Sequence, residues 1–262
     1  MTAPPPPAPK LALVTGGMHR LGAAIAARLA AAGYALALHK HHASDPEAHL
    51  AAALERHGTH WHRFRADLGN VEEVATLIPR IVAHFGRAPD LLVNNAALFA
   101  EGSWDAMTAT DLARMTGVNH HAPVLLAQAL VAASPPTSQP TIVNIVDQRV
   151  ANPVPDQLAY SLSKGALFQA TRTLAAAFGS RARVNAVAPG LTIVTDDYTP
   201  GQAERLAARM PLGHLPTPAD VADAVLFLAQ ATATTGQTIF VDGGASITPL
   251  GRDFVYLERD ES

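Results

Sequence analysis

The chain contains no cysteine among its 262 residues. Disulfides, thiol nucleophiles and thiolate metal sites are therefore excluded, and nothing requires an oxidising compartment. Charge is also scarce, because only 16% of the residues are charged and the formal net charge is -3. Lys and Arg form no run of five or more, so the sequence lacks the basic footprint typical of proteins that bind a nucleic-acid backbone. We expect no nucleic-acid partner.

The sequence also lacks an apolar run long enough for a membrane-spanning helix, which needs about 20 residues. The longest apolar stretches, such as residues 21–38, are interrupted by Arg28 and Gly33. The chain begins with a proline-rich segment rather than with the basic and then apolar start of a secretory signal. We expect a cytoplasmic protein with no membrane partner, in which residues 1–10 form a flexible leader.

Short apolar runs alternate with helical patterns along the rest of the chain. A strand at residues 11–15, a glycine turn, a helix at 21–32 and a strand at 34–38 form a βαβ unit. Further strands are expected at residues 91–93, 141–146, 183–187 and 238–241, and helices at 45–57, 71–85, 111–133, 159–178 and 219–229. This alternation predicts an α/β fold, a doubly wound parallel sheet of Rossmann type, in a single domain. The domain is expected to span residues 11–248, and residues 249–262 to form a mobile tail or a subunit contact.

A glycine-containing loop, Thr15-Gly-Gly-Met-His-Arg-Leu-Gly22, joins the first strand to the first helix. A nucleotide diphosphate binds at this place in a doubly wound sheet, because backbone N–H groups and the helix dipole favour an anion there. Gly16, Arg20 and Leu21 are therefore candidate cofactor residues. The G-x-G-x-x-G fingerprint is absent, and the alternative is a plain tight turn before a helix.

The second strand ends in Leu38-His-Lys-His-His42, where an NAD-binding protein usually carries Asp or Glu for the ribose 2′-hydroxyl. No acid is present to repel a 2′-phosphate, whereas Arg20, His39, Lys40 and His42 could donate to one. The sequence thus predicts NADPH rather than NADH. The alternative is that this histidine-rich strip is a solvated loop or an accidental metal site; we predict no metal.

Tyr160 and Lys164 lie four positions apart, hence on one face of a helix. A nearby ammonium favours the phenolate and lowers the pKa of a phenol, so Tyr160 is expected to transfer a proton. With the glycine loop, Asn94-Asn-Ala-Ala97, Asn119 and Pro189-Gly190, this pair resembles the short-chain dehydrogenase/reductase family from residue 11 to residue 247.

The resemblance implies roles for individual residues. Tyr160 would be the proton donor, Lys164 its electrostatic partner and a ribose ligand, and Asn119 the residue that holds a relay water. The implied cofactor contacts also include Asp67 and Leu68 beside the adenine, Asn95, Ala96 and Ala97 along the cofactor, and Pro189 and Gly190 near the nicotinamide. A homotetramer, with the helix that carries Tyr160 at an interface, is implied as well.

Two residues depart from the general family pattern. Arg20 stands where the loop usually has glycine, and Asp147 stands where most members have a serine that polarises a carbonyl. A carboxylate there would oppose the negative charge that develops when a ketone is reduced. Together with His39 and Phe99, these residues resemble the pteridine reductases and dihydromonapterin reductases. The resemblance implies that Phe99 stacks on a pterin and that Asp147 serves a proton relay through Tyr160.

The leading hypothesis is an NADPH-dependent reductase of the C=N bond of a dihydropterin or dihydrofolate-like substrate. The alternative is a reductase of a small ketone or sugar, and a third possibility is a catalytically silent NADP-binding sensor. The interpretation of two residues is also open. Phe99 could be an ordinary core aromatic, and Asp147 could be a strand-end cap bonded to loop amides.

Overall fold

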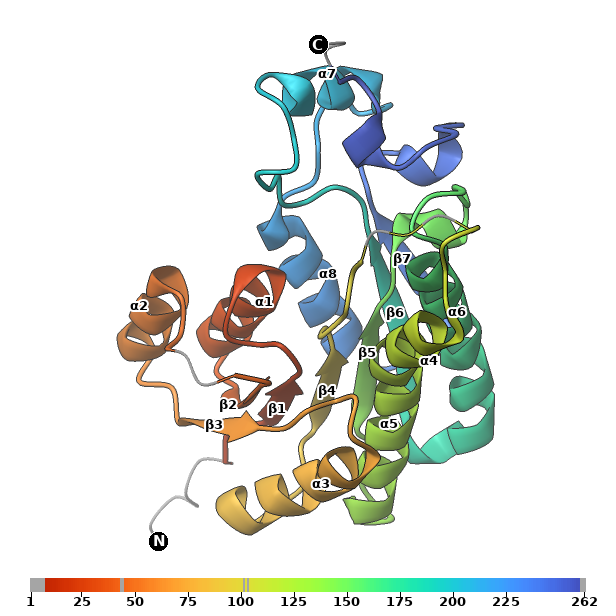
Figure 1. The fold of residues 1–262 in the computed structure, drawn as a ribbon. Helices are drawn as coiled ribbons and strands as arrows, with labels where there is room; N and C mark the ends of the chain where they lie inside the picture. Colours follow the sequence, from red (N-terminus) through yellow and green to blue (C-terminus); the bar gives the residue numbers. More distant parts are fainter. Residues whose placement is uncertain (1–7, 43–44, 101, 103, 260–262) are drawn as a thin grey trace, which may run out of the picture.

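The computed structural model describes residues 8–42, 45–100, 102 and 104–259. Most of the expected leader and the last three residues of the expected tail lie outside this range. In the described part of the chain, seven parallel strands form one sheet in the order β3-β2-β1-β4-β5-β6-β7 (Figure 1). The strands are β1 (Leu11–Val14), β2 (Ala35–Lys40), β3 (Trp61–Arg65), β4 (Leu91–Asn94), β5 (Thr141–Ile145), β6 (Arg183–Pro189) and β7 (Thr238–Val241).

Helices cover both faces of this sheet (Figure 1). One apolar core lies between the sheet and α1 (Arg20–Ala31), α2 (Ala48–Arg56) and α8 (Pro218–Gln230). A second core lies on the opposite face, under α3 (Val71–Phe85), α5 (Ala122–Ala133) and α6 (Leu158–Phe178). The predicted doubly wound α/β fold is therefore confirmed. The strand order reverses between β1 and β4, and a crevice for a ligand is expected at the carboxyl ends of these strands.

Two elements escaped prediction from the sequence. β3, with the sequence WHRFR, is an edge strand, and only Phe64 in it is buried. α7 (Gln202–Arg209) has few apolar residues and buries only Gln202 and Leu206. β3 lacks the continuous apolar run of the central strands, and α7 is a short, largely polar segment. In the sequence, each therefore resembles a connecting loop.

The helix expected at residues 111–133 is divided in the structure. α4 (Ala109–Thr116) is followed by a π-helical turn, Gly117–His121, and then by α5. Pro123 at the start of α5 has no N–H to donate to the carbonyl four residues earlier, which disfavours a regular α-helical turn here. That carbonyl belongs to Asn119, and such turns often occur at functional sites.

The segment after β7 folds back onto the domain. Leu250 and Phe254 are buried against Leu206 of α7, and the Gln202 side chain donates to the carbonyl of Leu257 over 2.6 Å. Figure 1 shows this segment, in dark blue, beside the loop that leads from β5 to α6. The residues expected to be a mobile tail or a subunit contact thus contact their own chain as far as Arg259, which donates to the Asp197 carbonyl.

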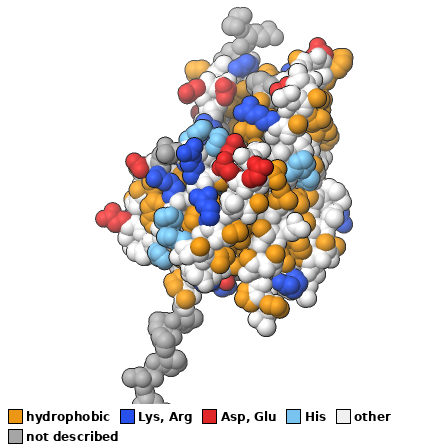
Figure 2. Space-filling view, turned by 60° about the horizontal axis from the view of Figure 1, so that its bottom comes forward, with side chains coloured by type: hydrophobic (Ala, Val, Ile, Leu, Met, Phe, Trp, Pro, Cys, Tyr) orange, Lys and Arg blue, Asp and Glu red, His pale blue; other side chains and the backbone are white. Residues whose placement is uncertain are grey.

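The surface carries charges of both signs. Figure 2 shows Lys, Arg and His side chains gathered on one side of the face it presents, with a smaller group of acidic side chains beside them. Among the described residues, no helix is long and apolar enough to cross a membrane.

Candidate active site

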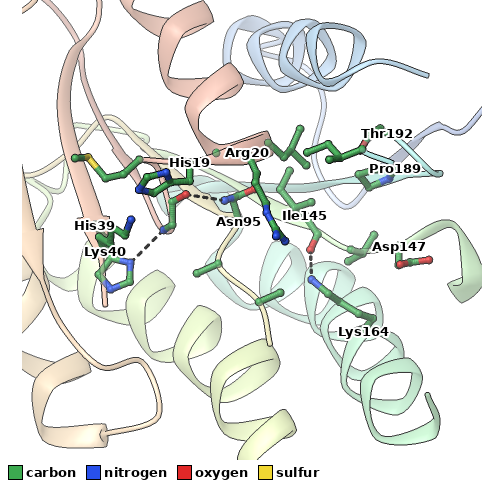
Figure 3. Close-up of a pocket in the computed structure, with 18 of the residues that line it drawn as sticks. His19, Arg20, His39, Lys40, Asn95, Ile145, Asp147, Lys164, Pro189 and Thr192 are labelled. Atoms are coloured by element: carbon green, nitrogen blue, oxygen red, sulfur yellow. Dashed lines mark hydrogen bonds between the residues drawn. The ribbon is translucent and has the colours of Figure 1, made fainter. Parts of the chain in front are cut away.

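A cavity of about 460 Å³ lies at the carboxyl ends of the central strands (Figure 3). Residues from the loop after β1 line one end, and residues that follow β5 and β6 line the other. Tyr160 and Lys164 of α6 complete the wall. A neighbouring cavity of about 360 Å³ shares His39, His41, Ala96 and Ala97 with the first. The topology therefore places the predicted site at the expected crevice.

The loop between β1 and α1 is closely packed. Gly16 has a φ of +61°, and a Cβ on Gly22 would lie 2.0 Å from the Gly16 carbonyl oxygen. Asn95 holds the loop from β4, since its amide donates to the Thr15 carbonyl over 2.9 Å. Because the glycines have no side chains, the loop backbone and the start of α1 face the cavity directly. Backbone N–H groups at the start of a helix suit a phosphate.

Arg20 occupies a left-handed conformation with a φ of +50°. A non-glycine residue in this conformation costs of order 1 kcal/mol, and its position explains why glycine is usual here. Its backbone N–H donates to Glu47 over 2.7 Å. Its side chain extends into the cavity, away from His39 and Lys40 (Figure 3). The Arg20 and Lys40 cations therefore serve different parts of the cavity.

The buried His39 side chain is hydrogen-bonded to two loops, the one after β1 and the one after β3. Its Nδ1 accepts the Gly16 N–H over 3.2 Å, so the proton lies on Nε2, which donates to the Ala66 carbonyl over 3.0 Å. Burial lowers the pKa of His39 to about 4, so the ring is neutral at physiological pH. The prediction that His39 donates to a 2′-phosphate is therefore wrong, because neither nitrogen has a hydrogen available.

The remaining basic residues at the end of β2 differ in position. Lys40 and His41 line the larger cavity, whereas His42 is exposed and its ring lies 4.0 Å from that of His41. Asp67 and Leu68 line the second cavity, on the side where the resemblance implies an adenine. In the described part of the chain, no three His, Asp or Glu side chains are grouped so that they could hold a metal ion.

Tyr160 and Asp147 are in direct contact. The phenol donates to Asp147 Oδ2 over 3.0 Å, and Tyr160 is buried. Burial and then the negative charge of Asp147 raise the pKa of Tyr160 well above its usual value, while Arg149 opposes them. The expectation that an ammonium lowers this pKa is wrong for this arrangement, and the phenol is fully protonated at neutral pH.

Lys164 is also buried and donates to the Ile145 carbonyl over 2.7 Å (Figure 3). Burial lowers the pKa of Lys164 to about 8, with Asp147 raising it and Arg149 lowering it. Its nitrogen lies 5.7 Å from the centre of the Tyr160 ring. Lys164 is thus close to Tyr160, but its direct hydrogen bond goes to the end of β5.

Arg149 and Asp253 are site residues that sequence reasoning missed. Arg149 Nε donates to Asp147 Oδ1 over 3.2 Å, and another guanidinium nitrogen lies 2.5 Å from Asp253. Asp147 also accepts the backbone N–H of Arg149, so it caps a short turn as well as binding Tyr160. The interpretation of Asp147 as a strand-end cap is therefore confirmed, and its part in a proton relay stays a prediction. The position of Arg149, two residues after Asp147, could have indicated that the two side chains interact. Asp253 is too far away in the sequence for any local pattern to associate it with Arg149.

Asn119 and Phe99 both lie at the loop after β4. The Asn119 side chain bonds to both backbone groups of Leu98 and to Ser163, so it holds the loop after β4 against α6. Phe99 lies in that loop, next to Leu98. It is 54% exposed and its ring lies 4.8 Å from that of Tyr160, edge to face. Phe99 is therefore not an ordinary core aromatic.

Comparison with known proteins identifies the family. A family model described as enoyl-(acyl carrier protein) reductase matches residues 17–246. The chain is a short-chain dehydrogenase/reductase. It is 36% identical to a ketoacyl reductase of the granaticin polyketide synthase of Streptomyces violaceoruber, over 94% of this chain and 100% of that protein. It is 34% identical to pteridine reductase 1 of Leishmania tarentolae, over 92% and 98% of the two chains.

A solved structure with a similar fold is the alternative dihydrofolate reductase FolM of Brucella canis in complex with NADP. It is 36% identical, the match covers 92% of this chain and 96% of that chain, and the TM-score is 0.84. Short-chain dehydrogenases/reductases are oxidoreductases that use NAD(P)H. The similar proteins include reductases of pteridines and of ketones, so the family alone does not select the substrate.

The geometry of this short-chain dehydrogenase/reductase fits a dinucleotide. The glycine loop leaves no room for a Cβ at Gly22, and α1 begins at the cavity with no cap from the side chain of His19, although Glu47 accepts the Arg20 N–H. Arg20, Lys40 and Lys164 supply cationic donors along its length, and Pro189 and Gly190 line the wall at the end of β6. Both the shape and the donors suit two phosphates and a ribose.

Proposed function

We propose that this protein is an NADPH-dependent reductase of the C=N bond of a dihydropterin or dihydrofolate-like substrate. The observation that carries the proposal is the hydrogen bond from Tyr160 to Asp147, where most of the family has a serine. A serine hydroxyl can polarise a ketone, but it cannot take up and return a proton at neutral pH. A carboxylate can, and reduction of a C=N bond needs a proton at nitrogen.

The residues have distinct roles in this reaction. Bound NADPH supplies the hydride to the ring carbon. Tyr160 gives its proton to the adjacent ring nitrogen, and Asp147 returns a solvent proton to the phenol. Because Tyr160 is buried and its pKa is raised, an unassisted phenolate would be costly, and a neighbouring group that restores the proton is needed. Lys164 and Asn119 are assigned to the ribose and to the relay water.

Phe99 supports a planar substrate. Its exposed ring lies edge to face against Tyr160 and lines a separate cavity of about 290 Å³, and an aromatic ring in this position offers a stacking face to a pterin. A small aliphatic ketone would gain much less from such a contact.

A second candidate is reduction of a ketone, and one contact favours it. The Arg149 guanidinium lies 3.2 Å from Asp147, which offsets part of the negative charge that would oppose an alkoxide. The similarity to a ketoacyl reductase supports the same alternative.

An assay of NADPH oxidation separates the two candidates. The purified protein is tested with dihydropterins, quinoid pterins, dihydrofolate, small ketones and a β-ketoacyl thioester. We expect kcat/KM to be highest for a dihydropterin or for dihydrofolate, by at least about tenfold. Preference for the thioester or a ketone would overturn the proposal in favour of the second candidate.

A further inference from the structure

The two carboxylate oxygens of Asp147 accept hydrogen bonds from different donors, which hold the side chain in one orientation. Oδ1 accepts the backbone N–H of Arg149 over 3.0 Å and its Nε over 3.2 Å, while Oδ2 accepts the Tyr160 hydroxyl over 3.0 Å. Any smaller rotation of the carboxylate than a half-turn, which exchanges two equivalent oxygens, would break the contacts with these donors. Arg149 therefore contributes both donors that keep Oδ2 available to Tyr160.

The Arg149 side chain is itself held by three separate segments. Only 5% of it is exposed, and a guanidinium so buried must be paired to offset the loss of hydration. Besides Asp147, it donates to Gln157 and Ser161 at the start of α6, over 3.3 and 3.2 Å, and to Asp253 over 2.5 Å. The planar fork of arginine can serve all of these acceptors at once, which a lysine could not.

Asp253 comes from the C-terminal segment, far from the site in sequence. It begins a short turn that buries Phe254 and Val255, and its own backbone N–H donates to Asp156 over 2.7 Å. The segment is therefore anchored on both sides of the Arg149 contact. The guanidinium also lies 5.0 Å from the centre of the Tyr160 ring, so it touches both members of the pair.

We infer that Arg149 is a positioning residue, anchored by Asp253 of the C-terminal segment, that fixes the Asp147 carboxylate toward the Tyr160 hydroxyl. The inference rests on the proposed function, in which Asp147 and Tyr160 exchange a proton. It makes the C-terminal segment part of the active site, although no atom of that segment is required to contact the substrate.

A mutant cycle tests the inference in steady-state kinetics. Arg149→Gln should lower kcat by roughly tenfold to a hundredfold, the effect of losing a charged hydrogen bond, and leave the Kd for NADPH within about twofold. In an Asp147→Asn background, the same change should alter kcat by less than about twofold, because Arg149 acts through Asp147. If the loss of kcat in the double variant equalled the product of the losses in the two single variants, the inference would be overturned.

Further variants separate positioning from folding. Asp253→Asn leaves the contact between Arg149 and Asp147 in place but removes the negative charge that anchors Arg149. This variant should lower kcat by at least about threefold without changing the Kd for NADPH. Arg209→Gln is the matched control. Arg209 also pairs with a carboxylate of the C-terminal segment, that of Glu258, but the pair is partly exposed and does not involve Asp253 or Asp156, so kcat should not change. Equal effects of Asp253→Asn and Arg209→Gln would indicate a structural role only.

A crystal structure of the Arg149→Gln variant gives an answer that needs no substrate. The Asp147 carboxylate should rotate away from Tyr160, and persistence of the 3.0 Å contact would overturn the inference. If the wild-type protein reduces a ketone rather than a pterin, the proposed function fails. The mutant cycle is then measured with that ketone as substrate. The coupling between the Arg149 and Asp147 substitutions, together with the crystal structure, then decides the inference independently of the proposed function.

Discussion

Tyr160 donates its hydroxyl hydrogen to Asp147, whereas Lys164, four residues further along α6, donates to the carbonyl of Ile145. The phenol is therefore linked to a carboxylate that can exchange protons, and the ammonium is linked to the end of a strand. In the proposed function, this division gives proton transfer to the Asp147–Tyr160 pair and leaves Lys164 to bind the cofactor's ribose.

Removal of the phenolic hydroxyl tests the first part of this assignment. Tyr160→Phe keeps the ring against Phe99 but removes the acid, so kcat should fall by roughly 10²–10⁴-fold while the Kd for NADPH is unchanged. Tyr34→Phe is the control, because Tyr34 is equally a buried tyrosine but lies at the start of β2. More than a tenth of the normal rate in Tyr160→Phe would assign the acid to another group.

The pH dependence of cofactor capture tests the role of Lys164. Its pKa is about 8, so it is a cation below that pH and becomes neutral as the pH rises. The kcat/KM for NADPH reports groups of the free enzyme and should therefore decline as the pH rises through about 8. Lys164→Arg remains charged and should remove this decline, even if its absolute rate is lower. A decline that persists in this variant would come from a different group.

Lys40 and Arg20 should differ in their effect on cofactor choice. Lys40 lies at the end of β2, where the absence of an acid admits a 2′-phosphate, so Lys40→Ala should weaken NADPH by about tenfold to a hundredfold and NADH by less than about twofold. Arg20 extends into a different part of the cavity (Figure 3), so Arg20→Ala should weaken both cofactors. Fluorescence titration measures the four affinities. An equal loss of NADPH and NADH binding in Lys40→Ala would contradict this assignment.

His39 makes folding stability depend on pH. The pKa of His39 falls from 6.5 to about 4 on folding, so the unfolded chain binds a proton in this range that the folded chain does not. Stability should thus decline as the pH falls from about 6.5 toward 4, by up to about 3 kcal/mol from this residue. In His39→Gln, urea unfolding should show a smaller decline, whereas the exposed His42→Gln should behave as wild type. A decline in His39→Gln equal to that of wild type would place the effect elsewhere.

The fold could be predicted because the central strands of a parallel sheet are buried on both faces and therefore read as continuous apolar runs. β3 could not, since an edge strand with the sequence WHRFR has one neighbour and little burial. The π-helical turn at Asn119 was equally hidden, because Pro123 signals a disturbance of the helix without showing its form.

The site was predicted where its chemistry depends on local spacing, and not where it depends on tertiary contacts. Tyr160, Lys164 and Asp147 could be assigned from their positions along the chain. The pairing of Arg149 with Asp253 joins residues 104 positions apart, which no local pattern indicates. The pKa of Tyr160 was misjudged for a related reason, because its burial and the direction of the Lys164 hydrogen bond are properties of the folded protein.

The measurement that tests the central claim most directly is a competition for a labelled hydride. Equal concentrations of a dihydropterin and a β-ketoacyl thioester are mixed with limiting NADPH that carries deuterium at the transferable position, and the products are analysed by mass spectrometry. The account predicts that most of the deuterium appears on a pterin ring carbon, and that Asp147→Ser moves label toward the alcohol of the thioester. Deuterium found mainly in the alcohol with the wild-type protein would contradict the account.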